Sequence, residues 1–343
     1  MGNPSRAVLA GVGVTCGALF LAVSLGQDDD GGGSAAAQPK PSAGAPRTTT
    51  LSGSPSGPYV ALGDSYTSGA GIPAQSGRPA GCDRSDRNYP ALVAEELKLD
   101  AAGFRDVSCS GATTAGLSAP QSTGHGTNPA QLSALSAKTR LVTVGIGGND
   151  IGFASLVERC VKAGAIYYAT GSGKYTGDDA PCRSRYVSES ESGSASDSGS
   201  GSDSGATDVV RQKIRAVGER LDSTLAEVER RAPQARVYVV GYPAILPDGG
   251  HGCDDDMTIA PEDLAFLHDK EQQLNSALRE RAEAAGAGYV DTYTPSVGHD
   301  ACTATGTRWV EPLIPASPAA PVHPNARGER AMADAVLRAL RGS

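Results

Sequence analysis

The chain has 343 residues, which is enough for one large domain or two small ones with a substantial buried core. Its formal net charge is -8, and its 30 Lys and Arg residues are scattered along the sequence. Because they form no basic stripe with interleaved aromatic residues, the composition argues against nucleic acid as a partner.

The first 26 residues have the pattern of an export or membrane segment. Arg6 precedes an apolar run over residues 7–26, and an Asp triplet and a Gly-rich tract follow it. The run is long for a signal-peptide core, so residues 1–26 are predicted to be a signal peptide or a membrane anchor. We favour cleavage, which predicts a secreted or extracytoplasmic protein. The alternative is membrane or cell-envelope association through this segment.

Two further segments have compositions that disfavour a packed core. Residues 27–58 contain mostly Gly, Ser, Ala, Pro and Thr and are predicted to be a disordered linker. The folded domain is predicted over residues 59–343, with a flexible, low-complexity insert at residues 188–208 that is rich in Ser and Asp. A calcium loop is disfavoured there because the acidic residues do not have the spacing of an oxygen-ligand loop.

Strands and helices are predicted to alternate along this domain. Short runs rich in β-branched or aromatic residues predict strands at residues 59–62, 104–108, 141–146, 237–241 and 289–292. Apolar residues at helical spacing predict helices over residues 88–99, over residues 207–231, from Pro261 onward, and from Asn325 to about residue 340. This alternation predicts an α/β fold with a central parallel five-stranded sheet covered on both faces.

Outside the apolar N-terminal run, the chain has an even number of cysteines. In an exported protein, six cysteines indicate three disulfides with fifteen possible pairings. Spacing favours neighbours in the sequence: Cys82–Cys109, Cys160–Cys182 and Cys253–Cys302. A metal site is disfavoured because there is neither a CxxC motif nor a Cys/His cluster with ligand spacing.

Small polar turns follow four of the predicted strands. They are Gly63-Asp64-Ser65, Cys109-Ser110-Gly111, Gly147-Gly148-Asn149-Asp150 and Gly241-Tyr242-Pro243. Because ligands of open parallel sheets bind beyond the carboxyl ends of the strands, these turns are expected to gather around one site. Ser65 is the candidate nucleophile of an acyl transfer. The N–H groups of Ser65 and Gly111 and the side-chain amide of Asn149 are candidate donors to an oxyanion.

The general base is expected to be a histidine, and the chain has five. His323 is the candidate because the sequence "PVHPN" places it in a proline-restricted loop before the last predicted helix. A surface or turn position is the simpler interpretation for His125, His251 and His268, and His299 is a reserve candidate.

Four blocks in order, "GDSYTSGAG", "SCSGATT", "GIGGND" and "PVHPN", resemble blocks I, II, III and V of the SGNH (GDSL) hydrolase family. The chain most resembles the secreted, three-disulfide lipase and esterase branch. This resemblance implies a flavodoxin-like three-layer α/β/α sandwich. It also implies Ser65 as nucleophile and first oxyanion donor, Gly111 and Asn149 as the other donors, and His323 as general base and acid. The branch supports the sequential disulfide pairing as well.

One position departs from the family pattern. The family usually has Asp three residues before the histidine, and this chain has Ala320 there. A carboxylate at that position would orient the imidazole and stabilise its protonated form. We therefore expect a Ser–His dyad in which a backbone carbonyl near Ala320 supports His323, with a distant Asp as the alternative. Asp64 and Asp150 are more simply interpreted as ordering their own turns.

The resemblance implies cofactor-free hydrolysis of carboxylic acyl esters, and we expect it to proceed through an acyl-enzyme on Ser65. A metalloenzyme is disfavoured because the ligand cluster is missing. The expected function is an exported lipase or esterase that degrades small-molecule or lipid esters, and the chain is expected to be a monomer. Phospholipase A-type activity and polysaccharide deacetylation are the enzymatic alternatives. A non-catalytic envelope-binding module is the alternative from another functional class, because a fold does not fix a function.

Overall fold

The computed structural model describes residues 57–170, 180–188, 207–248, 253 and 257–342. At its centre is a five-stranded parallel sheet with the spatial order β4, β1, β7, β10, β11. The strands are β1 (Tyr59–Gly63), β4 (Phe104–Asp106), β7 (Leu141–Gly145), β10 (Arg236–Val240) and β11 (Gly288–Val290). This is the 2-1-3-4-5 order of flavodoxin-like folds. The predicted fold class is confirmed.

The described part of the chain contains eight α-helices. They are α1 (Ser65–Ser68), α2 (Tyr89–Glu96), α3 (Thr114–Ser118), α4 (Gly148–Ile151), α5 (Phe153–Thr170), α6 (Val209–Arg231), α7 (Pro261–Ala284) and α8 (Ala326–Gly342). Helices α2, α6, α7 and α8 confirm the four predicted ones. Helix α6 begins two residues later than predicted, because the Asp208 side chain accepts a hydrogen bond from the Arg211 N–H at 2.9 Å and caps the helix.

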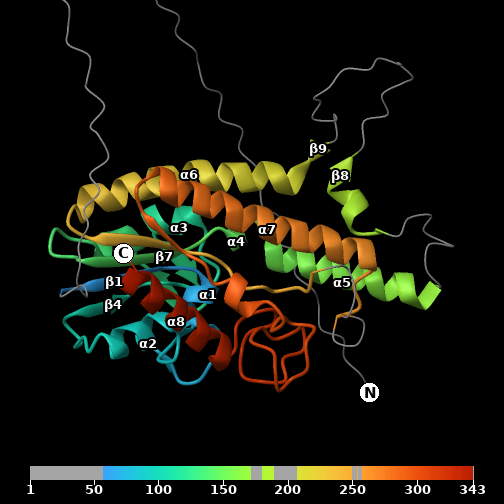
Figure 1. Cartoon of the computed structure of the whole chain (residues 1–343), viewed down its shortest axis with the longest axis horizontal. Coiled ribbons are helices and arrows are strands. Elements are labelled where there is room, and N and C mark those ends of the chain that lie inside the picture. The colour runs from blue at the N-terminus through green and yellow to red at the C-terminus, as the bar shows by residue number, and fades with distance from the viewer. Residues whose placement is uncertain (1–56, 171–179, 189–206, 249–252, 254–256, 343) are drawn as a thin grey trace, which may run out of the picture. The chain divides into compact units, whose positions relative to one another are not determined.

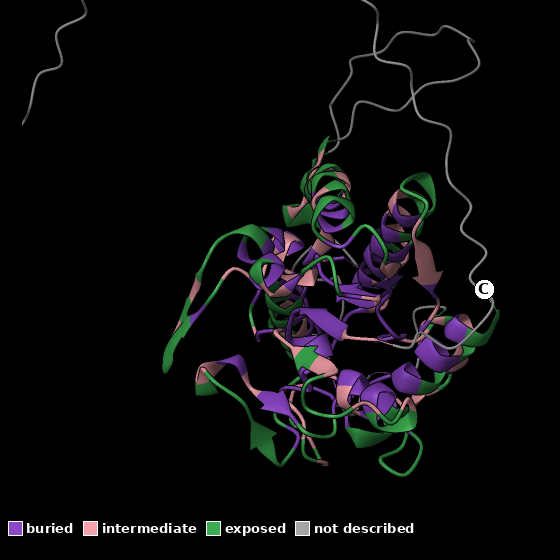
Figure 2. Cartoon of the chain, turned by 90° about the vertical axis from the view of Figure 1, so that its left-hand side faces the viewer, coloured by how far each residue is buried: buried purple, intermediate pink, exposed green. Residues whose placement is uncertain are grey.

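The helices form a layer on each face of the sheet. Val60 and Leu62 of β1 belong to a core with α5, α6 and α7, whereas Tyr59 and Ala61 belong to a second core with α2 and α8. This division follows from the alternation of side chains along a strand. Figure 1 shows α5, α6 and α7 on one side of the strands and α2 and α8 on the other. Buried residues concentrate on the strands and on the helix faces toward them (Figure 2).

Within the described ranges, three two-stranded sheets lie outside the central one. They pair β2 (Gln75–Ser76) with β3 (Arg84–Ser85), β5 (Gln121–Thr123) with β6 (Gly126–Asn128), and β8 (Val187–Ser188) with β9 (Thr207–Asp208). The β8–β9 pair joins the two ends of the predicted insert, whose residues 189–206 lie outside the described part. Buried Lys270 of α7 lies 2.6 Å from the Asp208 carboxylate, which fixes this pair to the main core.

Three disulfides connect elements of the domain. They are Cys82–Cys109, Cys160–Cys182 and Cys253–Cys302. This is the sequential pairing favoured by the spacing and supported by the resemblance. The first bond holds the chain just before Gly111.

The predictions for the N-terminal segment fall on residues that the structure does not describe. The signal peptide or anchor (1–26) and all but the last two residues of the linker (27–58) lie there. Among the helices that are described, none is both long and apolar enough to span a bilayer.

Candidate active site

Ser65 lies at the turn from β1 into α1, at the carboxyl end of a central strand. The turn requires glycine at position 63, where φ is +157° and an added Cβ would lie 2.6 Å from the Gly145 carbonyl oxygen. The Asp64 carboxylate accepts a hydrogen bond from the Tyr66 N–H at 3.0 Å and caps α1. Ser65 is therefore the first residue of the helix, beyond the edge of the sheet.

His323 lies in the loop before α8, and the structure brings it to Ser65. The Nε2 atom of His323 is 2.7 Å from the Oγ atom of Ser65. The Nδ1 atom is 2.7 Å from the carbonyl oxygen of Pro321. Because a carbonyl can only accept, this contact requires the proton on Nδ1 and leaves the lone pair of Nε2 facing Ser65. The expected carbonyl near Ala320 is thus that of the next residue, Pro321.

The surroundings of His323 keep its imidazole neutral. Burial lowers the pKa of His323, and the hydrogen bond to the Pro321 carbonyl raises it by a smaller amount. No carboxylate is among these causes. A neutral imidazole with a free Nε2 lone pair is the form that can accept a proton from Ser65.

The expected oxyanion donors lie on turns next to Ser65. Among the described residues, the N–H groups of Ser65 and Gly111 take part in no hydrogen bond. Gly111 has a φ of +75°, a conformation that favours glycine. The Nδ2 atom of Asn149 in α4 donates to the Ala112 carbonyl at 2.9 Å, which uses one of its two hydrogens and leaves one for a substrate.

A pocket reaches Ser65, Asn149 and His323 together. Phe153, Ala154, Ile245, Leu274 and Val322 give it apolar walls. Gly111 does not line this pocket. It precedes Ala112, whose carbonyl accepts the hydrogen bond from Asn149, so Gly111 lies beside the pocket. The apolar walls are suited to the hydrocarbon part of a ligand.

Glu271 is a buried carboxyl group in the wall of this pocket. Burial holds its pKa well above the usual range for a glutamate. One carboxyl oxygen accepts the Ile245 N–H at 2.8 Å. Burial therefore disfavours the charged form of Glu271 in this otherwise apolar wall.

Asp64 has a second partner that the sequence did not reveal. The Tyr242 hydroxyl donates to the Asp64 carboxylate at 2.6 Å and accepts the Gly148 N–H at 2.8 Å. This chain of bonds joins the Ser65 turn to the turn that carries Asn149. Burial raises the pKa of Asp64 to about 7, although the bonds from Tyr242 and from the Tyr66 N–H favour the charged form.

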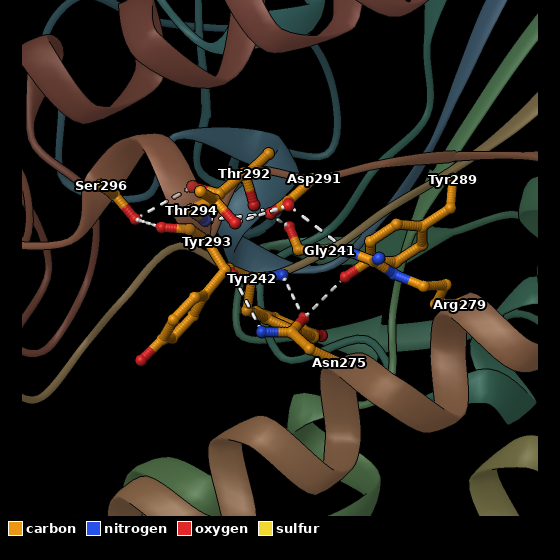
Figure 3. Close-up of polar contacts among 10 residues, drawn as sticks. All are labelled: Gly241, Tyr242, Asn275, Arg279, Tyr289, Asp291, Thr292, Tyr293, Thr294 and Ser296. Carbon is orange, nitrogen blue, oxygen red and sulfur yellow. Dashed lines mark hydrogen bonds and ion pairs between the residues drawn. The ribbon is translucent and has the colours of Figure 1, made fainter. Parts of the chain in front are cut away.

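Tyr242 is in turn held by the network shown in Figure 3. The Asn275 side chain accepts the Tyr242 N–H at 2.8 Å and donates to the Tyr242 carbonyl at 3.0 Å. The Tyr289 hydroxyl donates to Asn275 at 3.2 Å, and the Thr292 hydroxyl donates to the Gly241 carbonyl at 2.6 Å. The loop after β10 is thereby fixed to α7 and β11. The signal for this loop in the sequence is the small turn Gly241-Tyr242-Pro243 after a strand.

The other histidines have different surroundings. His268 contacts the Tyr293 hydroxyl at 2.8 Å, and the ring of His299 stacks on Trp309 at 4.0 Å between centroids. His125 is exposed in a loop, and His251 lies outside the described residues. Within the described ranges there is no group of three or more His, Cys, Asp or Glu residues that could hold a metal ion.

Comparison with solved structures agrees with this fold. A phospholipase A1 from Streptomyces albidoflavus NA297 superposes with a TM-score of 0.62 at 28% identity, covering 82% of this chain and 98% of that one. An extracellular lipase from Streptomyces rimosus also gives a TM-score of 0.62, at 26% identity, covering 83% of this chain and 100% of that one.

Comparison of sequences identifies the family. The chain is 37% identical over 284 residues to Lipase 2 of Streptomyces coelicolor, covering 82% of this chain and 85% of that relative. An esterase of Streptomyces scabiei is 27% identical, covering 71% of this chain and 72% of the esterase. Residues 61–331 match the model of the GDSL-like lipase/acylhydrolase family. These matches and the shared fold show that the chain belongs to this family and is a carboxylic ester hydrolase.

Proposed function

We propose that Ser65 and His323 form the catalytic dyad of this hydrolase. The contact of 2.7 Å between Ser65 Oγ and His323 Nε2 carries the proposal. Nε2 takes the hydroxyl proton while Oγ forms a bond to the ester carbonyl carbon. Nε2 then gives this proton to the alcohol oxygen as the carbon–oxygen bond breaks, which leaves the acyl group on Ser65.

The second half of the reaction uses the same groups. Nε2 takes a proton from a water molecule, and the water oxygen attacks the acyl carbonyl carbon. The bond to Ser65 Oγ then breaks, and Oγ takes the proton back from Nε2 as the carboxylic acid leaves. During both steps the Pro321 carbonyl holds the Nδ1 hydrogen, which keeps the imidazole in one orientation.

The developing negative charge on the carbonyl oxygen needs hydrogen-bond donors. We assign this role to the N–H groups of Ser65 and Gly111 and to the second hydrogen of the Asn149 amide. Two observations support this assignment. Neither N–H has another partner in the described part, and the Ala112 carbonyl fixes the Asn149 side chain. Preorganised donors of this kind commonly provide the largest single contribution to such catalysis.

We propose lipid and simple carboxylic esters as the substrates. The apolar walls formed by Phe153, Ile245 and Leu274 suit an acyl chain. Phospholipid acyl esters are the second candidate, because a structurally similar protein is a phospholipase A1. The three disulfides and the similarity to an extracellular lipase support action outside the cytoplasm.

The test is hydrolysis of p-nitrophenyl esters from acetate to palmitate, and of phosphatidylcholine, by the full-length protein and its Ser65→Ala variant. Ser68→Ala is the matched control, because Ser68 is also buried in α1 but its hydroxyl contacts only the Ser65 carbonyl, at 3.4 Å. We expect the Ser65→Ala variant to lose hydrolysis and the Ser68→Ala variant to keep it. Equal activity of the Ser65→Ala variant and the wild type would refute the dyad. The chain-length profile would separate esterase from lipase activity.

A further inference from the structure

We infer that Tyr66 is the positioning residue that holds His323 against Ser65. This inference rests on the proposed dyad. Tyr66 follows Ser65 directly in α1, and its hydroxyl donates to the carbonyl oxygen of Val322 at 2.5 Å. Its ring also packs against the imidazole of His323, with 4.7 Å between ring centroids and 35° between ring planes. One side chain thus contacts both the base and the residue before it.

The hydrogen bond from Tyr66 holds Val322 in an unusual backbone conformation. Its φ is +61°, a left-handed conformation that is unfavourable for a β-branched side chain. Such a conformation persists only where the surroundings hold it. Val322 is buried, its N–H donates to the Pro312 carbonyl at 3.3 Å, and its carbonyl accepts from Tyr66. Loss of the Tyr66 hydroxyl would leave a buried carbonyl without this donor and free the backbone to relax.

The geometry explains how His323 can work without a carboxylate at position 320. Two consecutive carbonyls fix the loop: Pro321 accepts from His323 Nδ1, and Val322 accepts from Tyr66. Because Tyr66 and Ser65 are neighbours in one helical turn, anchoring the loop to Tyr66 also fixes the distance between base and nucleophile. Burial keeps the pKa of the Tyr66 hydroxyl well above its usual value, so it remains a donor over the working pH range.

The experiment measures kcat and KM for p-nitrophenyl acetate with Tyr66→Phe, which removes the hydroxyl and keeps the ring. Tyr186→Phe is the control, since the Tyr186 hydroxyl accepts from Arg159 at 3.1 Å and the residue is not part of the pocket. We expect Tyr66→Phe to lower kcat by about 10-fold, as for loss of one neutral hydrogen bond, with KM within about 2-fold. We expect Tyr186→Phe to match the wild type.

The double variant with Tyr66→Phe and His323→Ala separates positioning of the base from a general effect on the fold. If the hydroxyl acts through the base, Tyr66→Phe has no further effect on the residual rate of a His323→Ala enzyme. An unchanged kcat, or an equal loss in the His323→Ala background, would overturn the inference. Failure of Tyr66→Phe to unfold cooperatively would assign the hydroxyl to the fold and overturn it too. The dyad fails separately, if Ser65→Ala remains active.

Discussion

His323 Nε2 lies 2.7 Å from Ser65 Oγ although 258 positions separate the two residues in the chain. The fold creates this contact because Ser65 follows strand β1 of the central sheet and His323 precedes α8, which packs against the same sheet. On the far side of the imidazole, the Pro321 carbonyl holds Nδ1. In the proposed dyad, the hydroxyl proton of Ser65 therefore has a defined acceptor before substrate binds.

Asn149→Ala tests the assignment of the oxyanion donors. Removal of one such donor typically lowers kcat by about 10²–10³-fold, and we expect a loss in this range. Asn128→Ala is the matched control, because the Asn128 amide also donates to a backbone carbonyl, that of Val107 at 3.2 Å, but does not line the pocket. Steady-state kinetics with equal losses for the two variants would argue against an oxyanion role for Asn149.

Ala320→Asp restores the residue that the family usually has at this position. We expect no gain in kcat, because the Pro321 carbonyl already holds the Nδ1 proton at 2.7 Å. The backbone there is also constrained: the Ala320 N–H donates to the Ala70 carbonyl at 2.8 Å, and a Cβ at Gly71 would lie 2.3 Å from the Ala320 nitrogen. An increase of about 10-fold or more, the effect of roughly 1.4 kcal/mol, would show that the carbonyl is a poor support.

The pH profile of kcat/KM tests the state of His323. Burial lowers the pKa of His323, so the imidazole remains neutral at pH values below the ordinary pKa of a histidine. We expect the acidic limb of the profile to have an apparent pKa below about 6.5. Asp64, with a pKa of about 7, and Glu271 also line the pocket. The pH profile of the Asp64→Asn variant separates the contribution of Asp64 from that of His323. An apparent pKa that changes in this variant, or one above about 6.5 in the wild type, would contradict the assignment of the acidic limb to His323.

Asp64 also makes stability depend on pH. Its pKa is about 7 in the folded chain and near 3.9 in an unfolded one, so the folded state binds the extra proton between these values. The contribution of Asp64 to stability is therefore lost as pH rises from about 4 to 7. We expect Asp64→Asn to gain stability relative to the wild type over this range. Urea unfolding at several pH values checks this, and a pH-independent difference would contradict it.

The sequence was sufficient to predict the sheet, and it points to the residues that the fold brings together at the candidate site. Each of the five predicted strands begins and ends within two residues of the observed one, because its apolar run is bounded by turn residues. Ser65 and His323 could be assigned to one site because both belong to motifs of the resembling family. The carbonyl that supports His323 could be placed only approximately, since φ at Val322 is not evident from residue types.

Other features depend on tertiary packing. Helix α5 is not among the predicted helices, although its buried residues Phe153, Leu156, Val157 and Cys160 have helical spacing. The bonds that Tyr242 makes to Asp64 and Asn275 join residues 178 and 33 positions apart, so no local pattern indicates them. The interpretation of Asp64 as a turn residue is correct for its capping bond but omits its bond to Tyr242.

Labelling with a serine-reactive phosphonate, followed by peptide mapping by mass spectrometry, tests the dyad most directly. We expect one phosphonyl group per chain, on Ser65, with parallel loss of ester hydrolysis. Labelling should be much slower in His323→Ala, because Ser65 then has no partner at 2.7 Å to take its proton. Two results would contradict the proposed mechanism. One is inactivation of the treated protein with the label on a residue other than Ser65, and the other is full ester hydrolysis by protein that is labelled on Ser65.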